Sequence, residues 1–258
     1  MAIETRETKP RAGALSRRNV SLGIVCPMAN ESGSAARFVR EALAACGDLR
    51  SAAFYAVVDN ASHDGTRGVL ADFARTEPRL RVVWAPENRS VAGAYLRGYR
   101  EALGAGHDFI LEIDAGFSHL PADIPQFLDA MEQGYDCVFG SRFMPGGRIV
   151  DSPAWRRFLS YGGTLLTNFL VGTRLRDMTS GFELFSREAL QLALARGIHS
   201  RAHFFQTEIK FHCRHLNVAE VLITYSAATP GVGGGALADA FLNLYRLWKA
   251  RWRDEPIR

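Results

Sequence analysis

Polar and acidic side chains gather where three predicted apolar strands end. The first strand is followed by Ala29, Asn30 and Glu31, the second by the string DNASHDGT and the fourth by the string DAGFSH. The carboxyl ends of parallel strands meet at one edge of a sheet, where ligands bind. DNASHDGT also suits a turn, and Asp64 is predicted to cap the next helix. Asp59 directly ends a buried strand and is not needed for a cap, so the three polar ends together favour a binding site.

The elements that would position these groups alternate between strands and helices. Strands are predicted at residues 20–27, 53–60, 80–85, 109–114, 137–140 and 218–225, and helices at 35–46, 64–74, 91–103, 121–133, 155–171, 188–195, 206–216 and 236–253. The runs SLGIVCP, AAFYAVVD and DFILEID are almost continuously apolar, which predicts strands buried on both faces. The pattern predicts an α/β fold with a doubly wound, mostly parallel sheet covered by helices.

Composition and charge indicate one large domain with a small anionic ligand or an anionic surface as partner. The 258 residues, 47% apolar and 22% charged, can bury a full core. The net charge of +4 is carried almost wholly by arginine, whose planar donor fork suits phosphate. A nucleic-acid-binding protein would show a denser basic stripe, so we expect no nucleic acid.

The chain ends and the cysteines bear on location. Residues 1–18 are predicted to be a disordered basic tail rather than a signal peptide, and residues 19–230 the main domain. No apolar run approaches the ~20 residues needed to span a bilayer. The four cysteines have no paired spacing, which argues against a disulfide framework or a zinc site and favours the reducing cytoplasm; they are Cys26, Cys46, Cys137 and Cys213.

Eight strings follow one another along residues 20–225: IVCPMANE, VVDNASHDGT, NRSVAGAYLRGYREAL, EIDAGFSHLPADIP, FGSRFMPGG, WRRFLSYGGTLLTNFLVG, DMTSGFELF and FFQTEIKF. In this order they resemble the signatures of glycosyltransferase family 2, and most closely those of its dolichol-phosphate mannosyltransferase branch. The resemblance implies a GT-A (Rossmann-like) fold and a nucleoside-diphosphate sugar as donor. It also implies inversion at the anomeric carbon of the sugar and a polyprenyl phosphate as acceptor.

The resemblance further implies roles for individual residues. Asp59 would accept the ring N–H of the base, and Asp114 would face the donor and a divalent metal, Mg2+ or Mn2+, with Ser118 or His119 as a weaker ligand. Arg142 would hold the phosphate of the acceptor, near the reacting atoms. The other residues implied to bind substrate are Pro27, Ala29, Glu31, Asp64, Arg89, Arg156 and Ser160.

The residue at position 206 bears on the acceptor. Many family members that glycosylate a hydroxyl carry a catalytic Asp in a Glu-Asp pair near the acceptor. The corresponding string in this chain is Phe205-Gln206-Thr207-Glu208, with the amide of Gln206 at the position of that Asp. A hydroxyl nucleophile must lose its proton during attack, whereas a phosphate oxygen is already anionic. Gln206 therefore favours a phosphate acceptor such as a polyprenyl monophosphate.

Two departures from the family pattern concern the diphosphate of the donor. The metal motif Asp-x-Asp reads Asp114-Ala115-Gly116, and Glu112 is predicted to lie too deep in the sheet to replace the missing carboxylate. The loop at residues 226–234 has no basic residue where the family usually has Arg and Lys. Three interpretations stay open: weak metal binding through Asp114 and water, an altered donor, or loss of catalysis. A Gly116→Asp variant is predicted to restore the carboxylate.

The last segment, residues 236–258, is predicted to be an amphipathic helix. Phe241, Tyr245, Trp248 and Trp252 share one stripe with basic residues between them. The stripe predicts either a helix packed on the core or one lying at the cytoplasmic face of a membrane, where a lipid acceptor would reside.

Two other functions stay open on sequence alone. One is transfer to a saccharide hydroxyl, and the other is a catalytically silent nucleotide-sugar-binding protein. A NAD-dependent oxidoreductase is excluded because no Gly-rich turn follows the first strand.

Overall fold

The computed structural model describes residues 15–150, 154–226 and 234–252, without the side chains of residues 154 and 156. The strands are β1 Ser21–Pro27, β2 Ser51–Val58, β3 Leu80–Trp84, β4 Phe109–Glu112, β5 Cys137–Ser141, β6 Arg148–Val150, β7 Glu183–Ser186, β8 Val218–Leu222 and β9 Thr224–Ser226. The helices are α1 Ala35–Ala45, α2 Thr66–Ala74, α3 Val91–Gly104, α4 Ile124–Glu132, α5 Ala154–Val171, α6 Arg187–Ala195, α7 Phe204–His212 and α8 Gly234–Arg251. Short 3-10 helices precede β1 at Arg17–Asn19 and α4 at Pro121–Asp123.

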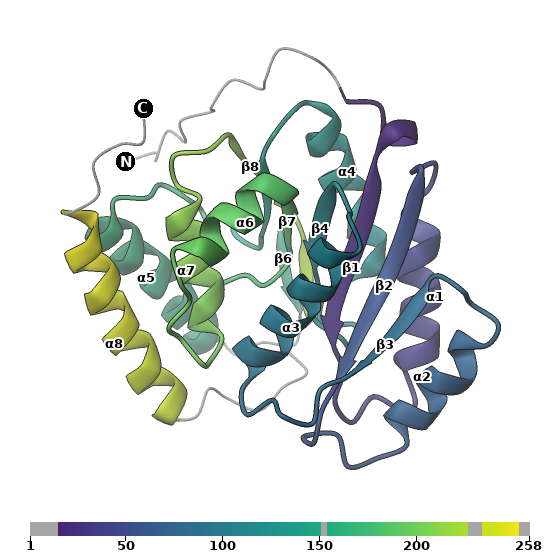
Figure 1. Cartoon of the computed structure of the whole chain (residues 1–258). Helices are drawn as coiled ribbons and strands as arrows, with labels where there is room; N and C mark the ends of the chain where they lie inside the picture. Colours follow the sequence, from purple (N-terminus) through teal and green to yellow (C-terminus); the bar gives the residue numbers. More distant parts are fainter. Residues whose placement is uncertain (1–14, 151–153, 227–233, 253–258) are drawn as a thin grey trace.

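Seven strands form the central sheet, in the order β3-β2-β1-β4-β7-β5-β8. All neighbouring pairs are parallel except those of β7, which runs antiparallel between β4 and β5. The predicted mostly parallel α/β sheet is therefore confirmed (Figure 1). β6 and β9 make a separate two-stranded parallel sheet.

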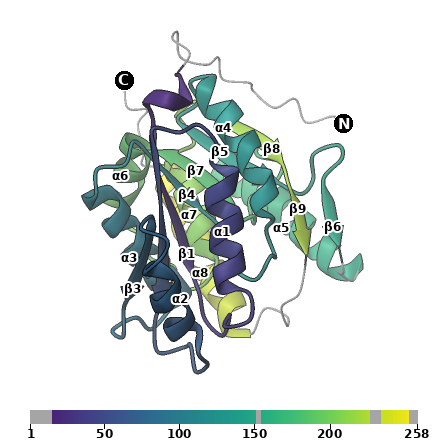
Figure 2. The same ribbon diagram turned by 90° about the vertical axis from the view of Figure 1, so that its right-hand side faces the viewer.

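Helices cover both faces of the sheet because its strands are apolar on both sides. One core contains α1, α2 and α4, which pack with Leu22, Ile24 and Cys26 of β1. The other contains α3, α6 and α7, which pack with Val25 of β1 and Phe139 of β5. Viewed along the sheet edge, α3 and α6 lie on one side of β1, and α1 and α4 lie on the other (Figure 2).

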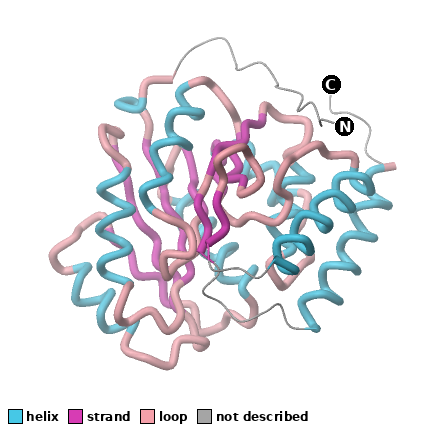
Figure 3. The backbone as a smooth tube through the Cα atoms, turned by 180° about the vertical axis from the view of Figure 1, so that it is seen from behind, coloured by secondary structure: helices cyan, strands magenta, loops and turns pink. Residues whose placement is uncertain are grey.

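A further layer of two helices, α5 and α8, lies outside α7. Val171, Leu244 and Leu247 are buried with Phe211 of α7 in a small apolar cluster. Arg251 at the end of α8 donates from Nη1 to the backbone oxygens of Phe169 and Leu170, at 2.9 and 3.1 Å. Cations suit the exposed carbonyls at a helix C-terminus. The pair lies away from the strands, at the right of Figure 3.

The structure differs from the predicted elements in several places. The strand β6 was not predicted, and α7 ends at His212, four residues before the predicted bound. The segment DMTSGFELF contains the strand β7, and the predicted strand at residues 218–225 is two strands separated by the buried Ile223. The predicted basic tail is shorter than 18 residues, because Arg17 is held by Asp129 and Glu132 of α4. Residues 1–14 and 253–258 lie outside the described ranges.

Candidate functional site

The three polar strand ends meet at one edge of the sheet. β1 lies between β2 and β4, and all three run parallel. Their ends therefore bring Pro27, Asp59 and Asp114 to neighbouring positions on the same edge, as predicted.

Asp114 lies two residues beyond β4, with its side chain 30% exposed. One carboxylate oxygen accepts the hydroxyl of Tyr95 from α3, and the other lies 3.3 Å from Nδ1 of His119. Burial opposes ionisation, but His119 and the Tyr95 hydroxyl outweigh it and hold the pKa of the Asp114 carboxyl below its ordinary value. Asp114 is thus an anion at neutral pH, fixed in orientation by two aromatic residues.

The loop after Asp114 has an unusual backbone. Gly116 and Phe117 are consecutive residues with positive φ, at 70° and 59°. A non-glycine residue rarely adopts this conformation, which costs about 1–3 kcal/mol and must be supported by its surroundings. Phe117 packs edge-on against Phe38 of α1, with ring centroids 5.1 Å apart, and under the guanidinium of Arg37 at 4.8 Å. These contacts fix the loop against α1.

The far end of the same loop is joined to β9. His119, 1% exposed, forms an isolated antiparallel bridge with Tyr225, and their rings lie 5.1 Å apart. The backbone N–H of Ser226 donates to the oxygen of Ser118 at 2.9 Å. The Ser118 hydroxyl, predicted to be a weak metal ligand, donates to the oxygen of Ala115 at 3.0 Å.

The ends of β1 and β2 are also joined to each other. Asn30, at φ 60°, donates to the oxygen of Ala61 and accepts the N–H of His63. Asp64 accepts the N–H groups of Ser32 and of Thr66, the first residue of α2, but the N-cap of this helix is Gly65, so the prediction that Asp64 caps it is wrong by one residue. These bonds give the predicted donor pocket a rigid rim.

The remaining predicted donor-pocket residues lie on this rim or near it. Ala29 is exposed, and Asp59 is half-buried and accepts the N–H of Ala61 at 2.9 Å through Oδ1. Arg89 is exposed beyond β3 and donates from Nη1 to the oxygens of Pro86 and Asn88. The nucleoside role of all three stays a prediction.

Arg142, predicted to hold the acceptor phosphate, is bound within the protein. Its Nε and Nη2 donate to the two carboxylate oxygens of Asp177, at 2.7 and 2.8 Å, and Nη2 also reaches the Thr179 hydroxyl. The side chain is only 9% exposed. Ser160 is half-buried on α5, and Arg156 lies on the same helix with its side chain outside the described part.

Gln206 is buried beneath the site, 3% exposed, at the start of α7. Its amide donates to Glu112 at 2.5 Å, and the Tyr99 hydroxyl donates to the other oxygen of Glu112. Burial and the nearby Glu183 hold the pKa of the Glu112 carboxyl well above its ordinary value. Glu112 is fully buried, in agreement with the prediction that it lies too deep to bind a metal.

A second buried group of charges lies beside Glu112. Glu183 of β7 pairs in register with Glu112 of β4, and its carboxylate lies 2.7 Å from Nζ of Lys210. Both side chains of this ion pair are 0% exposed. Sequence reasoning missed the pair, although Lys210 in the apolar helix string FFQTEIKF signals a buried cation.

The site residues fit a divalent cation that is bound together with a diphosphate. Within the described ranges, no three His, Cys, Asp or Glu side chains are grouped closely enough to hold a metal ion alone. Mg2+ and similar hard cations need only one or two carboxylates when substrate phosphates and water complete the coordination. Asp114 meets that requirement, whereas a preformed cage of protein ligands is not indicated.

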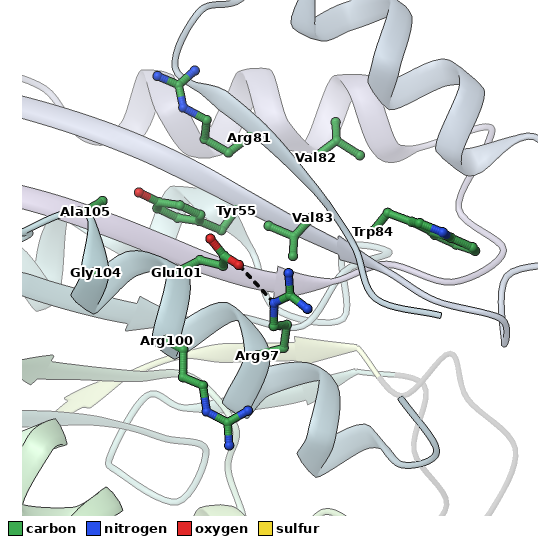
Figure 4. A pocket seen from close by; sticks show the side chains of 10 residues that line it. All are labelled: Tyr55, Arg81, Val82, Val83, Trp84, Arg97, Arg100, Glu101, Gly104 and Ala105. Atoms are coloured by element: carbon green, nitrogen blue, oxygen red, sulfur yellow. Dashed lines mark hydrogen bonds and ion pairs between the residues drawn. The ribbon is translucent and has the colours of Figure 1, made fainter. Parts of the chain in front are cut away.

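A hollow of about 530 Å³ lies elsewhere, between β3 and the C-terminal half of α3 (Figure 4). Arg97, on its wall, is bound to Glu101 at 2.9 Å and to Glu87 at 2.7 Å. None of the residues lining this hollow is among the predicted site residues, so it is separate from the edge that carries Asp114.

Comparison with known proteins agrees with the family resemblance found in the sequence. Residues 24–192 match the family described as Glycosyl transferase family 2. The chain belongs to this family. It is therefore a glycosyltransferase.

Named relatives are similar over most of the chain. An undecaprenyl-phosphate mannosyltransferase of Micrococcus luteus is 34% identical over 78% of this chain and 84% of its own length. A polyprenol monophosphomannose synthase of Mycolicibacterium smegmatis is 31% identical over 78% of each chain. A dolichol-phosphate mannosyltransferase of Pyrococcus furiosus is 26% identical, over 78% of this chain and 56% of its own.

A solved structure supports the GT-A fold. Glucosyl-3-phosphoglycerate synthase from Mycobacterium tuberculosis, in complex with Mn2+, UDP and phosphoglyceric acid, superimposes with a TM-score of 0.64 at 16% identity. The match covers 97% of this chain and 87% of that one. A divalent metal with UDP thus occurs in this fold.

Proposed function

We propose that the protein transfers a hexose from a nucleoside-diphosphate sugar to a polyprenyl monophosphate, with inversion at the anomeric carbon. The observation that carries the proposal is the state of Gln206, a buried amide that donates to Glu112. No ionised carboxylate stands at that position, and a phosphate nucleophile needs none because its oxygen is already anionic. The names of the three relatives support a polyprenyl phosphate acceptor and make mannose the first hexose to test.

The residues at the sheet edge would divide the work between donor and acceptor. The ends of β1 and β2 would bind the nucleoside through Asp59 and its neighbours, and Asp114 would face the diphosphate. A divalent cation held there would offset the charge of the departing diphosphate. Arg156, Ser160 and the free edge of Arg142 would orient the acceptor phosphate. Attack from the face opposite the diphosphate inverts the anomeric carbon in one displacement.

The outer helices α5 and α8 would hold the protein at the membrane surface that contains the acceptor. All large apolar residues that are exposed in the described chain lie on these two helices, except Leu15, Val150 and Trp252, which directly follows α8. On α5 they are Trp155, Phe158, Leu159, Tyr161, Leu165, Leu166 and Phe169, and on α8 they are Leu237, Phe241, Leu242, Tyr245 and Trp248. Exposed apolar groups in such number are typical of a protein or membrane contact.

The aromatic stripe of α8 was predicted either to pack on the core or to meet a membrane. Phe241 is 64% exposed and Trp252 is 72% exposed, whereas Leu244 and Leu247 form the buried side of the helix. Core packing of the stripe is therefore wrong. Lys249 lies over the ring of Tyr245 at 4.6 Å, so aromatic and cationic groups are interleaved, as suits an anionic membrane surface.

The cytoplasmic face is supported by the cysteines. All four are free and buried, as is typical of proteins in a reducing compartment. Within the described residues, no helix is both long enough and apolar enough to cross a membrane, so the proposed attachment is peripheral.

The decisive assay is transfer of labelled hexose from GDP- and UDP-sugars to a polyprenyl monophosphate in liposomes, with a free disaccharide as the competing acceptor. We expect an acid-labile lipid-linked product whose anomeric configuration is opposite to that of the donor. Asp114→Asn is expected to lower the rate by about 100-fold or more, as loss of a group that stabilises developing charge does. Turnover with the sugar hydroxyl but not with the lipid phosphate would contradict the proposal.

Membrane attachment is tested separately by sedimentation with anionic liposomes. Phe158→Ser with Phe169→Ser removes two rings that are each 79% exposed, and we expect binding to weaken by about 10-fold or more. Leu15→Ser, at an exposed apolar residue outside the α5–α8 face, is the matched control. Equal binding by both variants would argue against this face as the contact.

A further inference from the structure

Gly116 stands where the family places its second metal carboxylate, and the carboxylate of Glu31 is directly beside it. A Cβ atom built on Gly116 would lie 2.6 Å from Oε1 of Glu31 and 3.3 Å from its Cδ. Real Cβ contacts are longer than this, so the carboxylate of Glu31 already occupies the space that a side chain at position 116 would enter.

The backbone around Glu31 is fixed, so this approach is built into the fold. Its N–H donates to the Thr66 hydroxyl at 2.7 Å, and its oxygen accepts the N–H of Ala35 at 2.8 Å, where α1 begins. The Ser34 hydroxyl donates to Oε2. Oε1 is the carboxylate oxygen nearest to Gly116.

Asp114 and Glu31 belong to the same electrostatic environment. Burial raises the pKa of the Cys26 thiol well above its ordinary value, and the charges of Asp114 and then Glu31 raise it further. Glu31 Oε1 lies 2.6 Å from the position that a Cβ on Gly116 would take, and Gly116 follows Asp114 by two residues, so both carboxylates lie beside the loop after β4. Like charges brought together repel, which favours a cation between them.

The surroundings of Asp114 point independently to a missing ligand. His119 is 1% exposed and turns Nδ1 toward the Asp114 carboxylate at 3.3 Å, yet among the described residues neither of its ring nitrogens has a hydrogen-bond partner of good geometry. A buried polar group without a partner destabilises the folded protein. Carboxylates that bind metals are characteristically supported by such neighbouring groups, here His119 and Tyr95.

We propose that Glu31 supplies the second carboxylate for a divalent cation that Asp114 binds together with the donor diphosphate, in place of the side chain that Gly116 lacks. The inference rests on the proposed nucleoside-diphosphate donor. The second carboxylate ligand of the metal then comes from the end of β1, whereas the family motif places it in the loop after β4. This arrangement also explains why position 116 is a glycine, since any side chain would displace Glu31.

The first test measures Mn2+ binding from the electron paramagnetic resonance signal of free Mn2+, in the presence of UDP and, separately, of GDP. Glu31→Gln keeps the size of the side chain and removes its charge. We expect it to weaken Mn2+ binding by the nucleotide-bound protein by about 10-fold or more, and to weaken nucleotide binding much more in Mn2+ than in EDTA. Glu41→Gln, which removes an exposed carboxylate of α1 paired with Arg37, is the matched control and should bind Mn2+ as wild type does.

The outcomes separate this inference from the proposed function. Unchanged Mn2+ affinity in Glu31→Gln, or wild-type protein that binds nucleotide but no Mn2+, overturns the inference and leaves the proposed transfer standing. An equal loss of nucleotide affinity in EDTA also overturns it, because Glu31 would then contact the nucleoside. Failure of the wild type to bind either nucleotide by calorimetry overturns both.

A second test moves the carboxylate between the two positions. Gly116→Asp alone forces a Cβ against Glu31 at a residue with φ 70°, so the single variant is expected to bind Mn2+ less tightly than wild type. Glu31→Ala combined with Gly116→Asp should recover Mn2+ affinity relative to either single variant. Tighter Mn2+ binding by Gly116→Asp with Glu31 intact would overturn the inference.

Discussion

The buried ion pair of Lys210 and Glu183 lies beside Glu112, and the loss in free energy of unfolding on removing Lys210 can be estimated. Both side chains are 0% exposed, Nζ lies 2.7 Å from Oε1 of Glu183, and Nζ also donates to the oxygen of Ser180 at 2.6 Å. Lys210→Met keeps the aliphatic stem but leaves the carboxylate without its cation. Breaking one side of a buried pair costs about 3–5 kcal/mol. For a chain of this size that is roughly 6–20 °C in Tm.

The size of this loss depends on pH in a definite direction. Burial raises the pKa of Glu183 from 4.5 to about 7, even though Lys210 acts to lower it. Without Lys210 the folded-state pKa rises further, so the folded protein binds a proton that the unfolded chain releases above about pH 4.5. Wild type loses stability as pH rises from about 4.5 to 7, whereas the variant continues to lose stability above pH 7. The penalty of Lys210→Met should be smallest at pH 5 and largest at pH 8.

Urea unfolding at both pH values measures the effect. The double variant Lys210→Met with Glu183→Leu removes both charges, and we expect it to lie within about 2 kcal/mol of wild type, since apolar replacement of a buried pair is often neutral. The Ser180 oxygen, which loses its donor, accounts for the remaining cost. A loss below about 1 kcal/mol for Lys210→Met at pH 8, or a double variant less stable than both single variants, would refute the reasoning.

Three further predictions use other buried contacts. Gly98→Ala places a Cβ 2.3 Å from Cγ1 of Val25, so it should lower the free energy of unfolding in urea by about 1–3 kcal/mol. Gly104→Ala is the control: a Cβ there has no heavy atom within 4 Å, so the variant should be neutral or slightly stabilising. Equal effects of the two variants would contradict the packing argument. Tyr95→Phe removes a donor to the Asp114 carboxylate, so the pKa of that carboxyl should rise. The acid limb of kcat/KM should then move to higher pH, and an unshifted limb would count against the contact. Iodoacetamide should leave the native protein unmodified, because all four cysteines are buried and the pKa of three of their thiols is raised. Mass spectrometry should find adducts only after denaturation, at Cys26, Cys46, Cys137 and Cys213.

Local sequence patterns were sufficient where an element is regular and long. The apolar runs of β1 and β2 and the periodicity of α1 and α3 predicted those elements to within about two residues of the observed bounds. β7 was missed because its four residues, ELFS, are too short for a periodic signal and pair antiparallel with strands that come earlier in the chain. Such pairing depends on tertiary contacts rather than on local propensity.

The sequence predicted where the candidate site lies, but it did not predict most of the contacts within the site. The strand ends carrying Asp59 and Asp114 were expected to meet and do meet. The approach of Glu31 to Gly116 was not predictable, because it depends on a loop with two consecutive residues of positive φ. Arg142 was expected to be available for phosphate, but its donors are largely taken by Asp177, a partner 35 residues further along the chain.

The position of β7 sets an order for assembly of the chain during synthesis. β3, β2, β1 and β4 are neighbours in the sheet, so the half that bears Asp59 and Asp114 can pair once residue 112 has emerged from the ribosome. β5 has no partner in that half, since its neighbours are β7 and β8, and it must wait until residues 183–186 have been made. Strand pairs that close long loops form late. The nascent chain can therefore pair the half that bears Asp59 and Asp114 while β5 is still an unpaired strand, and we expect it to be most prone to aggregation in this interval.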